Sequence, residues 1–338
     1  MSRKIAINGF GRIGRAVFRI LENDPEVEVV AINDLTDNGM LAHLLKYDSV
    51  HGAFNGTVEA AEDHILVNGR KVLATAEPDP TKLPWGENEV EVVLECTGHF
   101  RTRDTAAKHL DAGAKAVIVS APAKGEDMTV VVGVNDADLD PAQHRVVSCG
   151  SCTTNCLAPI VKVLDETYGI EHGVMTTIHA YTNDQKLLDL PHKDRRRARA
   201  AGLSMIPTST GAAAAIGKVL THLNGKLDGL AVRVPTADVS LVDFVATLKR
   251  APADAAEVNN AFTTAAEGPL KGVLATDDNE LVSIDFTGNP HSSIADLPNT
   301  KVMGNTVKVL SWYDNEWGFS CRMVDLTRLM LGLPRASA

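Results

Sequence analysis

The chain has 338 residues, of which 44% are hydrophobic, and carries a formal net charge of -10. This length suits two globular domains, and the acidic balance argues against bulk binding of nucleic acid. The N-terminus lacks the apolar core of a signal peptide, and no apolar run is long enough to span a bilayer. We therefore expect a cytoplasmic protein with no membrane contact, whose five cysteines are reduced.

The first 150 residues alternate between strand-like and helix-like segments. The apolar spacing predicts a strand over 4–8, a helix over 12–22 and a second strand over 27–33. Asn68-Gly69 predicts a tight hairpin turn between two short strands. Further strands are predicted from runs rich in β-branched residues, over 90–94, 116–119, 130–134 and 145–148. Such runs are typical of parallel strands covered on both faces, so we predict a doubly wound α/β domain of the Rossmann type.

The second half has longer helical patterns and more strands than crossovers. Strands are predicted over 173–178, 230–234, 239–248 and 302–312, and helices over 211–223, 254–266 and 316–331. This pattern favours an α+β domain with a mixed or antiparallel sheet and helices on one face. We place the nucleotide-binding domain at 1–151, completed by the C-terminal helix at about 316–338. The second, catalytic domain is placed at 152–315.

A glycine-rich turn follows the first predicted strand. Gly9-Phe10-Gly11-Arg12-Ile13-Gly14 matches G-x-G-x-x-G between a strand and a helix, the context of a dinucleotide pyrophosphate site. Asp34 lies twenty residues after Gly14, at the end of the second strand, where a carboxylate accepts the ribose hydroxyls. The carboxylate would repel a 2′-phosphate, which favours NAD over NADP. A glycine-rich turn with no ligand is the alternative interpretation.

A second motif, Ser151-Cys152-Thr153-Thr154-Asn155-Cys156, lies between a predicted strand and a predicted helix. At a helix start the dipole and the free N–H groups favour a thiolate, so Cys152 is a candidate nucleophile. His179, at the end of a strand-like run, is the candidate base, and a hydrogen-bonded structural histidine is the alternative. The cationic segment 193–199 could recognise phosphate, contact nucleic acid or form a solvated charge run. The leucines before it favour an interface.

Four long motifs together resemble the phosphorylating glyceraldehyde-3-phosphate dehydrogenase family. They cover residues 8–14, 151–156, 207–213 and 311–318, and the resemblance runs from the first strand to the last helix. It implies that Cys152 attacks the aldehyde of glyceraldehyde 3-phosphate and that His179 acts as base during hydride transfer to NAD⁺. Inorganic phosphate would then release the Cys152 thioester as 1,3-bisphosphoglycerate. The backbone N–H of Cys152 would help to hold the oxyanion.

The resemblance also implies binding residues and an assembly. Thr97, Ser120 and Asn315 resemble contacts to the cofactor, with Asn315 on the nicotinamide carboxamide. Thr182 and Arg233 resemble the residues that bind the substrate phosphate in the family. Five further residues resemble the family's site for inorganic phosphate: Ser151, Thr153, Arg197, Thr210 and Gly211. The segment 187–199 resembles a loop that lines a neighbouring subunit's cofactor pocket in a homotetramer. Leu190-Pro191 in this segment, together with Leu35, resembles the residues that NAD-using members of the family carry at these positions. No metal ion is expected.

Two positions depart from the family pattern. Cys149 replaces the usual asparagine and creates a C-x-x-C pattern with Cys152. Three interpretations of Cys149 are open. It is a small buried packing residue, a thiol that forms a disulfide with an oxidised Cys152, or a metal ligand together with Cys156 and His179. Phe319 stands where tyrosine is common. The alternative functions are an erythrose-4-phosphate dehydrogenase and a thiol-redox protein on the same fold.

Overall fold

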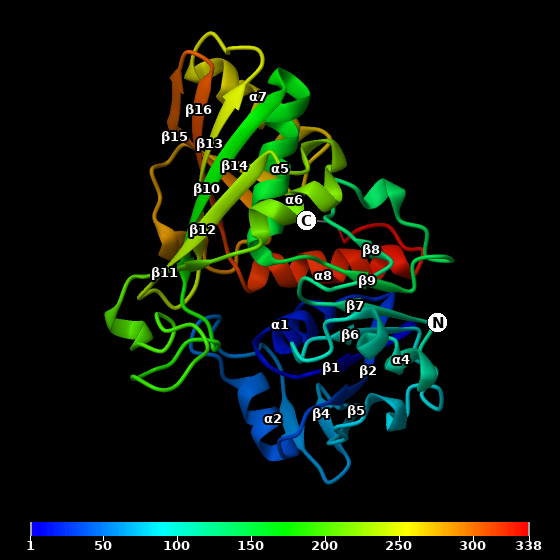
Figure 1. The fold of residues 1–338 in the computed structure, drawn as a ribbon. Helices are drawn as coiled ribbons and strands as arrows, with labels where there is room; N and C mark the ends of the chain where they lie inside the picture. Colours follow the sequence, from blue (N-terminus) through cyan, green and yellow to red (C-terminus); the bar gives the residue numbers. More distant parts are fainter. Residues whose placement is uncertain (1, 337–338) are drawn as a thin grey trace. The chain divides into compact units, whose positions relative to one another are not determined.

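The computed structural model describes residues 2–336, which form two compact units (Figure 1). The first unit comprises residues 2–130, Asp138–Gly150 and 320–336, and the second comprises Val131–Ala137 and Ser151–Phe319. Within residues 2–336, no helix combines the length and the apolar character that crossing a membrane would require.

The first unit is built on a mainly parallel sheet with the strand order β3-β4-β5-β2-β1-β6-β7-β9-β8. Its strands are β1 (Arg3–Asn8), β2 (Val27–Asn33), β3 (Val58–Ala60), β4 (His64–Val67), β5 (Arg70–Thr75), β6 (Val92–Glu95), β7 (Ala116–Val119), β8 (Met128–Thr129) and β9 (Val146–Ser148). Its helices are α1 (Arg12–Leu21), α2 (Asn38–Lys46), α3 (Arg103–Ala106) and α4 (Lys108–Asp111). Neighbouring strands among β1, β2, β6 and β7 pair in parallel, and most of their residues are buried, which confirms the predicted doubly wound sheet.

Two local predictions in the first half had different outcomes. Asn68 and Gly69 both have positive φ, at 51° and 79°, and join β4 to β5 as the predicted hairpin. The strand predicted over 130–134 is wrong, because β8 ends at Thr129 and the chain then turns. The N–H of Val131 donates to the side chain of Asn135 at 2.8 Å, and Val131 is buried in the core of the second unit. Apolar composition alone does not separate a buried strand from a buried turn.

The second unit contains a mixed sheet with the strand order β11-β12-β10-β13-β16-β15-β14. Its strands are β10 (Ile170–Ala180), β11 (Ile206–Ser209), β12 (Leu227–Val234), β13 (Ser240–Leu248), β14 (Leu274–Asp277), β15 (Ser293–Met303) and β16 (Thr306–Tyr313). β10 with β12 and β14 with β15 are parallel, and the other neighbours are antiparallel. The predicted mixed sheet is confirmed. The single strand predicted over 302–312 is instead the hairpin of β15 and β16, which turns at Gly304 with a φ of 63°.

Helices α5 (Cys152–Tyr168), α6 (Ala212–Val219) and α7 (Ala255–Glu267) pack on this sheet (Figure 1). α5 supplies much of the core, since Leu157, Ile160, Val161 and Leu164 are fully buried. Each such side chain contributes about 1.5–3 kcal/mol by leaving water, which holds the start of α5 in a defined place. α8 (Trp317–Met330) belongs to the first unit from Ser320 onward. Short 3₁₀ helices occur at η1 (Pro80–Lys82), η2 (Asp136–Asp138), η3 (Ala201–Leu203), η4 (Thr221–Leu223) and η5 (Ser283–Phe286).

Candidate functional site

The glycine-rich turn joins the end of β1 to the start of α1. Gly9 has a φ of +92°, and a Cβ atom there would lie 2.6 Å from the backbone nitrogen of Thr97. A Cβ atom on Gly14 would lie 2.2 Å from the carbonyl oxygen of Gly9, whereas Gly11 has nothing within 4 Å of that position. Glycine is therefore required at the first and third positions. The space at the second lets a phosphate approach the backbone at the start of α1.

A cleft of about 420 Å³ opens beside this turn. Four residues of the predicted cofactor set line it: Gly9, Gly11, Asp34 and Thr97. The Asp34 carboxylate accepts a hydrogen bond of 2.8 Å from the N–H of Phe10, which holds it against the turn. The remaining lining residues are Asn8, Asn33, Leu35, Glu77, Pro78, Cys96, His99 and Phe100. Backbone donors at a helix start and a carboxylate at the end of β2 fit a dinucleotide.

The other predicted cofactor residues of the first unit lie outside the lining. Phe10 is buried and packs edge-to-face on Phe18, with ring centroids 5.6 Å apart. The Arg12 guanidinium donates to Asp48 at 2.5 Å. Ser120 follows β7, and its N–H donates to the carbonyl of Glu95 at 3.0 Å. Ile13 and Gly14 complete this set, within α1. We infer that these residues shape the turn rather than form the wall of the cleft.

Sequence reasoning missed several lining residues, among them Asn8 and Asn33. Both are polar residues that directly follow an apolar stretch, and each lies at the carboxyl end of its strand. In an open α/β sheet ligands bind at that edge, so a polar residue there is a usable signal.

In the second unit, the start of α5 faces the end of β10. Ser151 caps the helix, and its side chain accepts from the N–H of Thr154 at 3.0 Å. Cys152 is the first helical residue, and its Sγ lies 3.5 Å from Nε2 of His179. The Tyr313 hydroxyl lies 2.9 Å from the hydroxyls of both Thr153 and Thr177, beneath the pair. The structure therefore brings together the predicted nucleophile and the predicted base.

The second ring nitrogen of His179 is held by the backbone. Nδ1 lies 2.7 Å from the carbonyl oxygen of Ala180. The carbonyl requires a proton on Nδ1, whereas the Arg233 guanidinium, 2.7 Å from the same nitrogen, can only donate to it, so the two contacts compete for Nδ1. When the ring proton lies on Nδ1, Nε2 presents its lone pair to the Cys152 thiol. This is the geometry that a general base requires.

Arg233 lies next to His179 because β10 and β12 pair in parallel, with His179 opposite Arg233 in the register. Its guanidinium donates to the carbonyl of Ala180 at 3.0 Å and lies 2.7 Å from Nδ1 of His179. Burial, helped by the charge of Arg233, lowers the pKa of His179 to about 3. The resting imidazole is therefore neutral.

Opposing influences act on the Cys152 thiol. Burial is the largest and raises its pKa above the ordinary value, whereas Arg233 and hydrogen bonds from Thr153 lower it. The backbone N–H groups of Thr153 and Cys152 lower the pKa of the thiol, as expected at a helix start, but burial outweighs them. Proton transfer to His179 creates two opposite charges close together, and each then stabilises the other. The thiolate is consequently a property of the pair rather than of Cys152 alone.

Replacing Arg233 by glutamine should raise the pKa of Cys152, because a positive charge that favours the thiolate is removed. We expect alkylation by iodoacetamide at pH 7, without substrate or cofactor, to slow by about three- to ten-fold, since the thiolate is the reactive form. The matched control is Arg196→Gln, which removes a positive charge from the cationic segment 193–199, on a guanidinium that donates to the carbonyl of Pro207, and should change the rate little. An unchanged or faster rate in Arg233→Gln would contradict this electrostatic role.

The predicted phosphate-site residues lie on several elements. The Thr182 N–H lies 3.3 Å from the side-chain oxygen of Gln185, just after β10. Thr210 and Gly211 stand at the start of α6, where the Thr210 hydroxyl accepts from the N–H of Ala212 at 3.2 Å. The Arg197 guanidinium already binds Asp184 at 2.6 Å and the hydroxyl of Thr208 at 3.0 Å. Two helix starts, α5 and α6, thus offer backbone donors suited to anions.

Asn315 is nearly buried, and its side-chain oxygen accepts from the Ser240 hydroxyl at 2.6 Å. This bond orients the amide so that its NH₂ group remains as a donor. The backbone beside it is fixed by Asp314, whose carboxylate accepts from the N–H groups of Glu316 and Trp317 at 2.9 and 2.7 Å.

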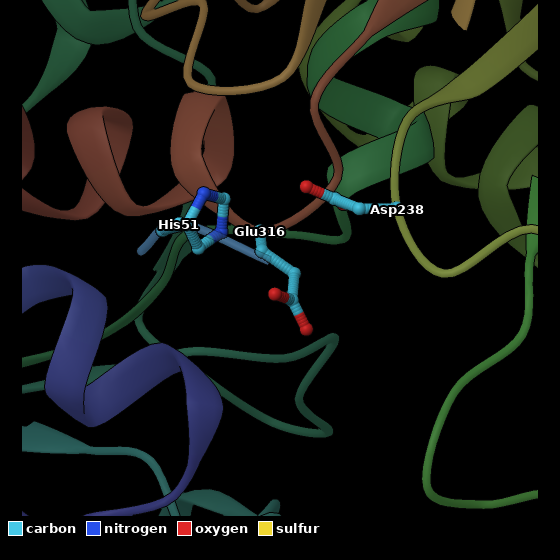
Figure 2. A group of neighbouring side chains, drawn as sticks. All are labelled: His51, Asp238 and Glu316. Atoms are coloured by element: carbon cyan, nitrogen blue, oxygen red, sulfur yellow. The ribbon is translucent and has the colours of Figure 1, made fainter. Parts of the chain in front are cut away.

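Sequence reasoning also missed Asp238, which is 5% exposed and precedes Val239, a residue with a φ of 64°. Figure 2 shows the side chains of Asp238 and Glu316, both from the second unit. Burial and the charge of Asp314 raise the pKa of Asp238 far above its usual range, and Glu316 adds to this. These influences favour the protonated form of the Asp238 carboxyl.

The two neighbouring cysteines are fully buried. Burial raises the pKa of Cys149 to about 12 and that of Cys156 also to about 12. Cys156 contacts the Ser293 hydroxyl at 3.8 Å and the Ser311 carbonyl at 3.7 Å. Thiols held so firmly in the protonated form are poor nucleophiles. This environment favours the packing role for Cys149 over the redox role.

Comparison with known proteins gives consistent matches along the chain. Residues 3–103 match the family model "Glyceraldehyde 3-phosphate dehydrogenase, NAD binding domain", and residues 151–315 match "Glyceraldehyde 3-phosphate dehydrogenase, C-terminal domain". The chain is 61% identical to glyceraldehyde-3-phosphate dehydrogenase 1 of Bacillus cereus over 97% of this chain and 98% of that protein. It is 58% identical to glyceraldehyde-3-phosphate dehydrogenase of Geobacillus stearothermophilus over 96% of this chain and 97% of that protein.

Proposed function

Because this chain belongs to the glyceraldehyde-3-phosphate dehydrogenase family, we propose that Cys152 and His179 carry out the aldehyde oxidation of that family. The protein is an NAD-dependent oxidoreductase that acts on glyceraldehyde 3-phosphate and inorganic phosphate. One observation supports the residue assignment above others: the 3.5 Å contact between the Cys152 thiol and Nε2 of His179 at the start of α5.

In the proposed first half-reaction, His179 takes the thiol proton and the Cys152 sulfur bonds to the aldehyde carbon. The carbonyl electron pair moves to oxygen, close to the free N–H groups at the start of α5, and His179 returns the thiol proton to that oxygen to give a thiohemiacetal. His179 Nε2 then removes that hydroxyl proton as the carbonyl forms again. When bound, NAD⁺ accepts the hydride that leaves the same carbon. The product on the chain is a Cys152 thioester.

In the second half-reaction, an oxygen of inorganic phosphate attacks the thioester carbon. The carbon–sulfur bond breaks, the electron pair returns to the Cys152 sulfur, and the acyl phosphate leaves as 1,3-bisphosphoglycerate. Arg233 and Thr182 would bind the substrate phosphate. The starts of α5 and α6, with Ser151, Thr153, Thr210, Gly211 and Arg197, would bind the attacking phosphate.

The first unit would hold the cofactor in the cleft beside the glycine-rich turn. The turn and the start of α1 would receive the pyrophosphate, Asp34 would accept from the ribose hydroxyls, and Thr97 would lie on the wall. Asn315 would donate its amide NH₂ group to the nicotinamide carboxamide. Asp34 disfavours a 2′-phosphate by charge repulsion, so kcat/KM should be higher with NAD⁺ than with NADP⁺. Equal values with the two cofactors would refute this preference.

A single assay tests the phosphorylating mechanism. We expect NADH formation from glyceraldehyde 3-phosphate to continue only when phosphate or arsenate is present, because the thioester otherwise accumulates. Without either anion, one equivalent of NADH per Cys152 should form in a burst and turnover should stop. Continued turnover at the same rate in the absence of both anions would refute the phosphorolysis step.

We further propose that the chain forms a homotetramer. The segment 187–199 and the residues after it expose apolar side chains, and Leu187, Leu188, Leu203 and Met205 are 84, 70, 83 and 75% exposed. A cluster of this kind is typical of a surface covered by another subunit. Sedimentation analysis should give a mass near four times 36.1 kDa, and Leu187→Glu should lower it. A monomer at assay concentrations would contradict the proposal.

We also propose a cytoplasmic location, because the reaction needs a reduced Cys152. Cell fractionation with detection of the protein tests this: recovery in a secreted fraction would contradict it.

A further inference from the structure

Behind the nucleotide cleft, the first unit buries a continuous polar network. Asn8, Asn33 and Glu95 end the adjacent parallel strands β1, β2 and β6, and Asn8 pairs with both of the others in the strand registers. They are 1, 5 and 1% exposed, and His109 of α4 is 0% exposed. Polar groups removed from water in this way need partners inside the protein.

Glu95 is the centre of this network. One carboxylate oxygen accepts from the N–H of Thr97 at 2.8 Å and from the Thr97 hydroxyl. The other accepts from the Asn8 amide at 2.6 Å and lies 3.1 Å from Nε2 of His109. Glu95 therefore holds two residues of the cleft, Asn8 and Thr97, in place at once.

The proton of His109 can be assigned from its other partner. The indole N–H of Trp85 donates to Nδ1 of His109 at 2.9 Å. An indole nitrogen only donates, so Nδ1 must carry a lone pair and the ring proton lies on Nε2. That proton points at Glu95, which accepts it. Trp85 thus fixes the tautomer in which the neutral imidazole is a donor to the carboxylate.

The network reaches the cleft through its polar members and through a packed ring. Asn8, Asn33, Thr97 and Phe100 line the cleft, whereas His109 does not. The His109 ring packs edge-to-face on Phe100, with ring centroids 6.3 Å apart and planes at 81°. The Thr97 hydroxyl gives its proton to Glu95 and accepts from the N–H of His99 at 3.1 Å. The orientation of these wall groups therefore depends on a histidine outside the cleft.

We propose that His109 is a positioning residue for NAD binding, which acts through Glu95 on Asn8 and Thr97 and through ring packing on Phe100. This inference rests on the proposed cofactor cleft. Loss of the imidazole leaves the Trp85 N–H without an acceptor and removes one of the four donors to Glu95. The wall of the cleft can then relax away from the geometry that the cofactor needs, so affinity for NAD⁺ falls although no direct contact is lost.

The test uses two substitutions in the full-length protein. His109→Leu keeps a similar volume and removes both hydrogen bonds, whereas His109→Gln offers an oxygen to Trp85 and an N–H to Glu95. By calorimetric titration we expect His109→Leu to bind NAD⁺ about ten-fold or more weakly and His109→Gln to stay within about three-fold of the original protein. KM for NAD⁺ should rise while KM for glyceraldehyde 3-phosphate and kcat at saturating NAD⁺ stay unchanged. An unchanged NAD⁺ affinity in folded His109→Leu would overturn the proposal, and so would an equal loss in both variants.

Three further measurements separate positioning from simple destabilisation. Alkylation of Cys152 without cofactor should be the same in His109→Leu as in the original protein, and a changed rate would count against the proposal. His64→Leu, in the same unit but outside the cleft lining, should leave NAD⁺ affinity unchanged. If His109→Leu does not fold, Trp85→Phe decides: it removes the N–H that fixes the tautomer, together with part of a buried ring, and it should weaken NAD⁺ binding by about three-fold. Unchanged binding would overturn the proposal.

Asp34→Asn should weaken NAD⁺ binding in every case, and failure to do so would refute the cleft itself rather than the role of His109.

Discussion

Replacing Cys152 by serine should lower kcat at least about 10³-fold, because a serine hydroxyl beside His179 is a far weaker nucleophile than a thiolate and the thioester cannot form. The affinity for NAD⁺ should not change, since the proposed cleft lies among residues of the first unit. Steady-state NADH formation and calorimetric NAD⁺ titration measure the two effects. A variant that retains more than about one tenth of the original kcat would show that Cys152 is not the nucleophile.

Cys149→Ala and Cys156→Ala are the matched controls for this substitution. Each removes a thiol from the same stretch of chain, and both thiols are fully buried with a pKa raised to about 12. We expect kcat within about three-fold of the original for both, with some loss of thermal stability from the small cavities. After peroxide treatment, mass spectrometry should find oxidised Cys152 without a Cys149–Cys152 disulfide. Formation of that disulfide would instead support a redox role for Cys149.

Replacing His179 by asparagine should lower kcat by about 10²- to 10⁴-fold, because the thiol and then the thiohemiacetal lose their proton acceptor. Asparagine can keep a donor toward the Ala180 carbonyl, so the end of β10 should be preserved. KM for NAD⁺ should change little. Stopped-flow measurement of the NADH burst tests whether the loss lies in the oxidation half-reaction. A normal burst with slow steady-state turnover would show that His179 acts in a step after the oxidation.

The same variant should respond differently to acid. Burial lowers the pKa of His179 to about 3, against about 6.5 for an unfolded histidine. Between these values the unfolded chain binds a proton that the native chain does not, so the free energy of unfolding falls as pH falls from about 6.5 towards 3. His179→Asn removes this contribution and should lose less stability across that range. Thermal melts at pH 7 and pH 5 measure the difference, and an equal loss in both proteins would contradict the buried neutral imidazole.

Local patterns predicted the parts of the molecule that depend on local geometry. The glycine turn was recognisable because its first and third positions exclude a side chain whatever the rest of the fold does. Asp34 was recognisable because the end of β2 follows from the apolar run before it. The doubly wound sheet followed from the alternation of buried strands and helices. The strand predicted over 130–134 failed because its apolar side chains are buried in a turn, which composition does not distinguish from a strand.

The sequence by itself determined the class of fold, the position of the glycine turn and the presence of a cysteine at a helix start. The tertiary structure alone decided which partners these residues have. His179 is 27 residues from Cys152, and Arg233 stands beside His179 because β10 and β12 pair in parallel. Burial, which depends on everything packed around a group, outweighs the groups at the helix start that lower the pKa of Cys152. It also favours the protonated form of Asp238 and, through Trp85, fixes the tautomer of His109. Charge and hydrogen bonding act through space, and one-dimensional spacing does not contain those distances.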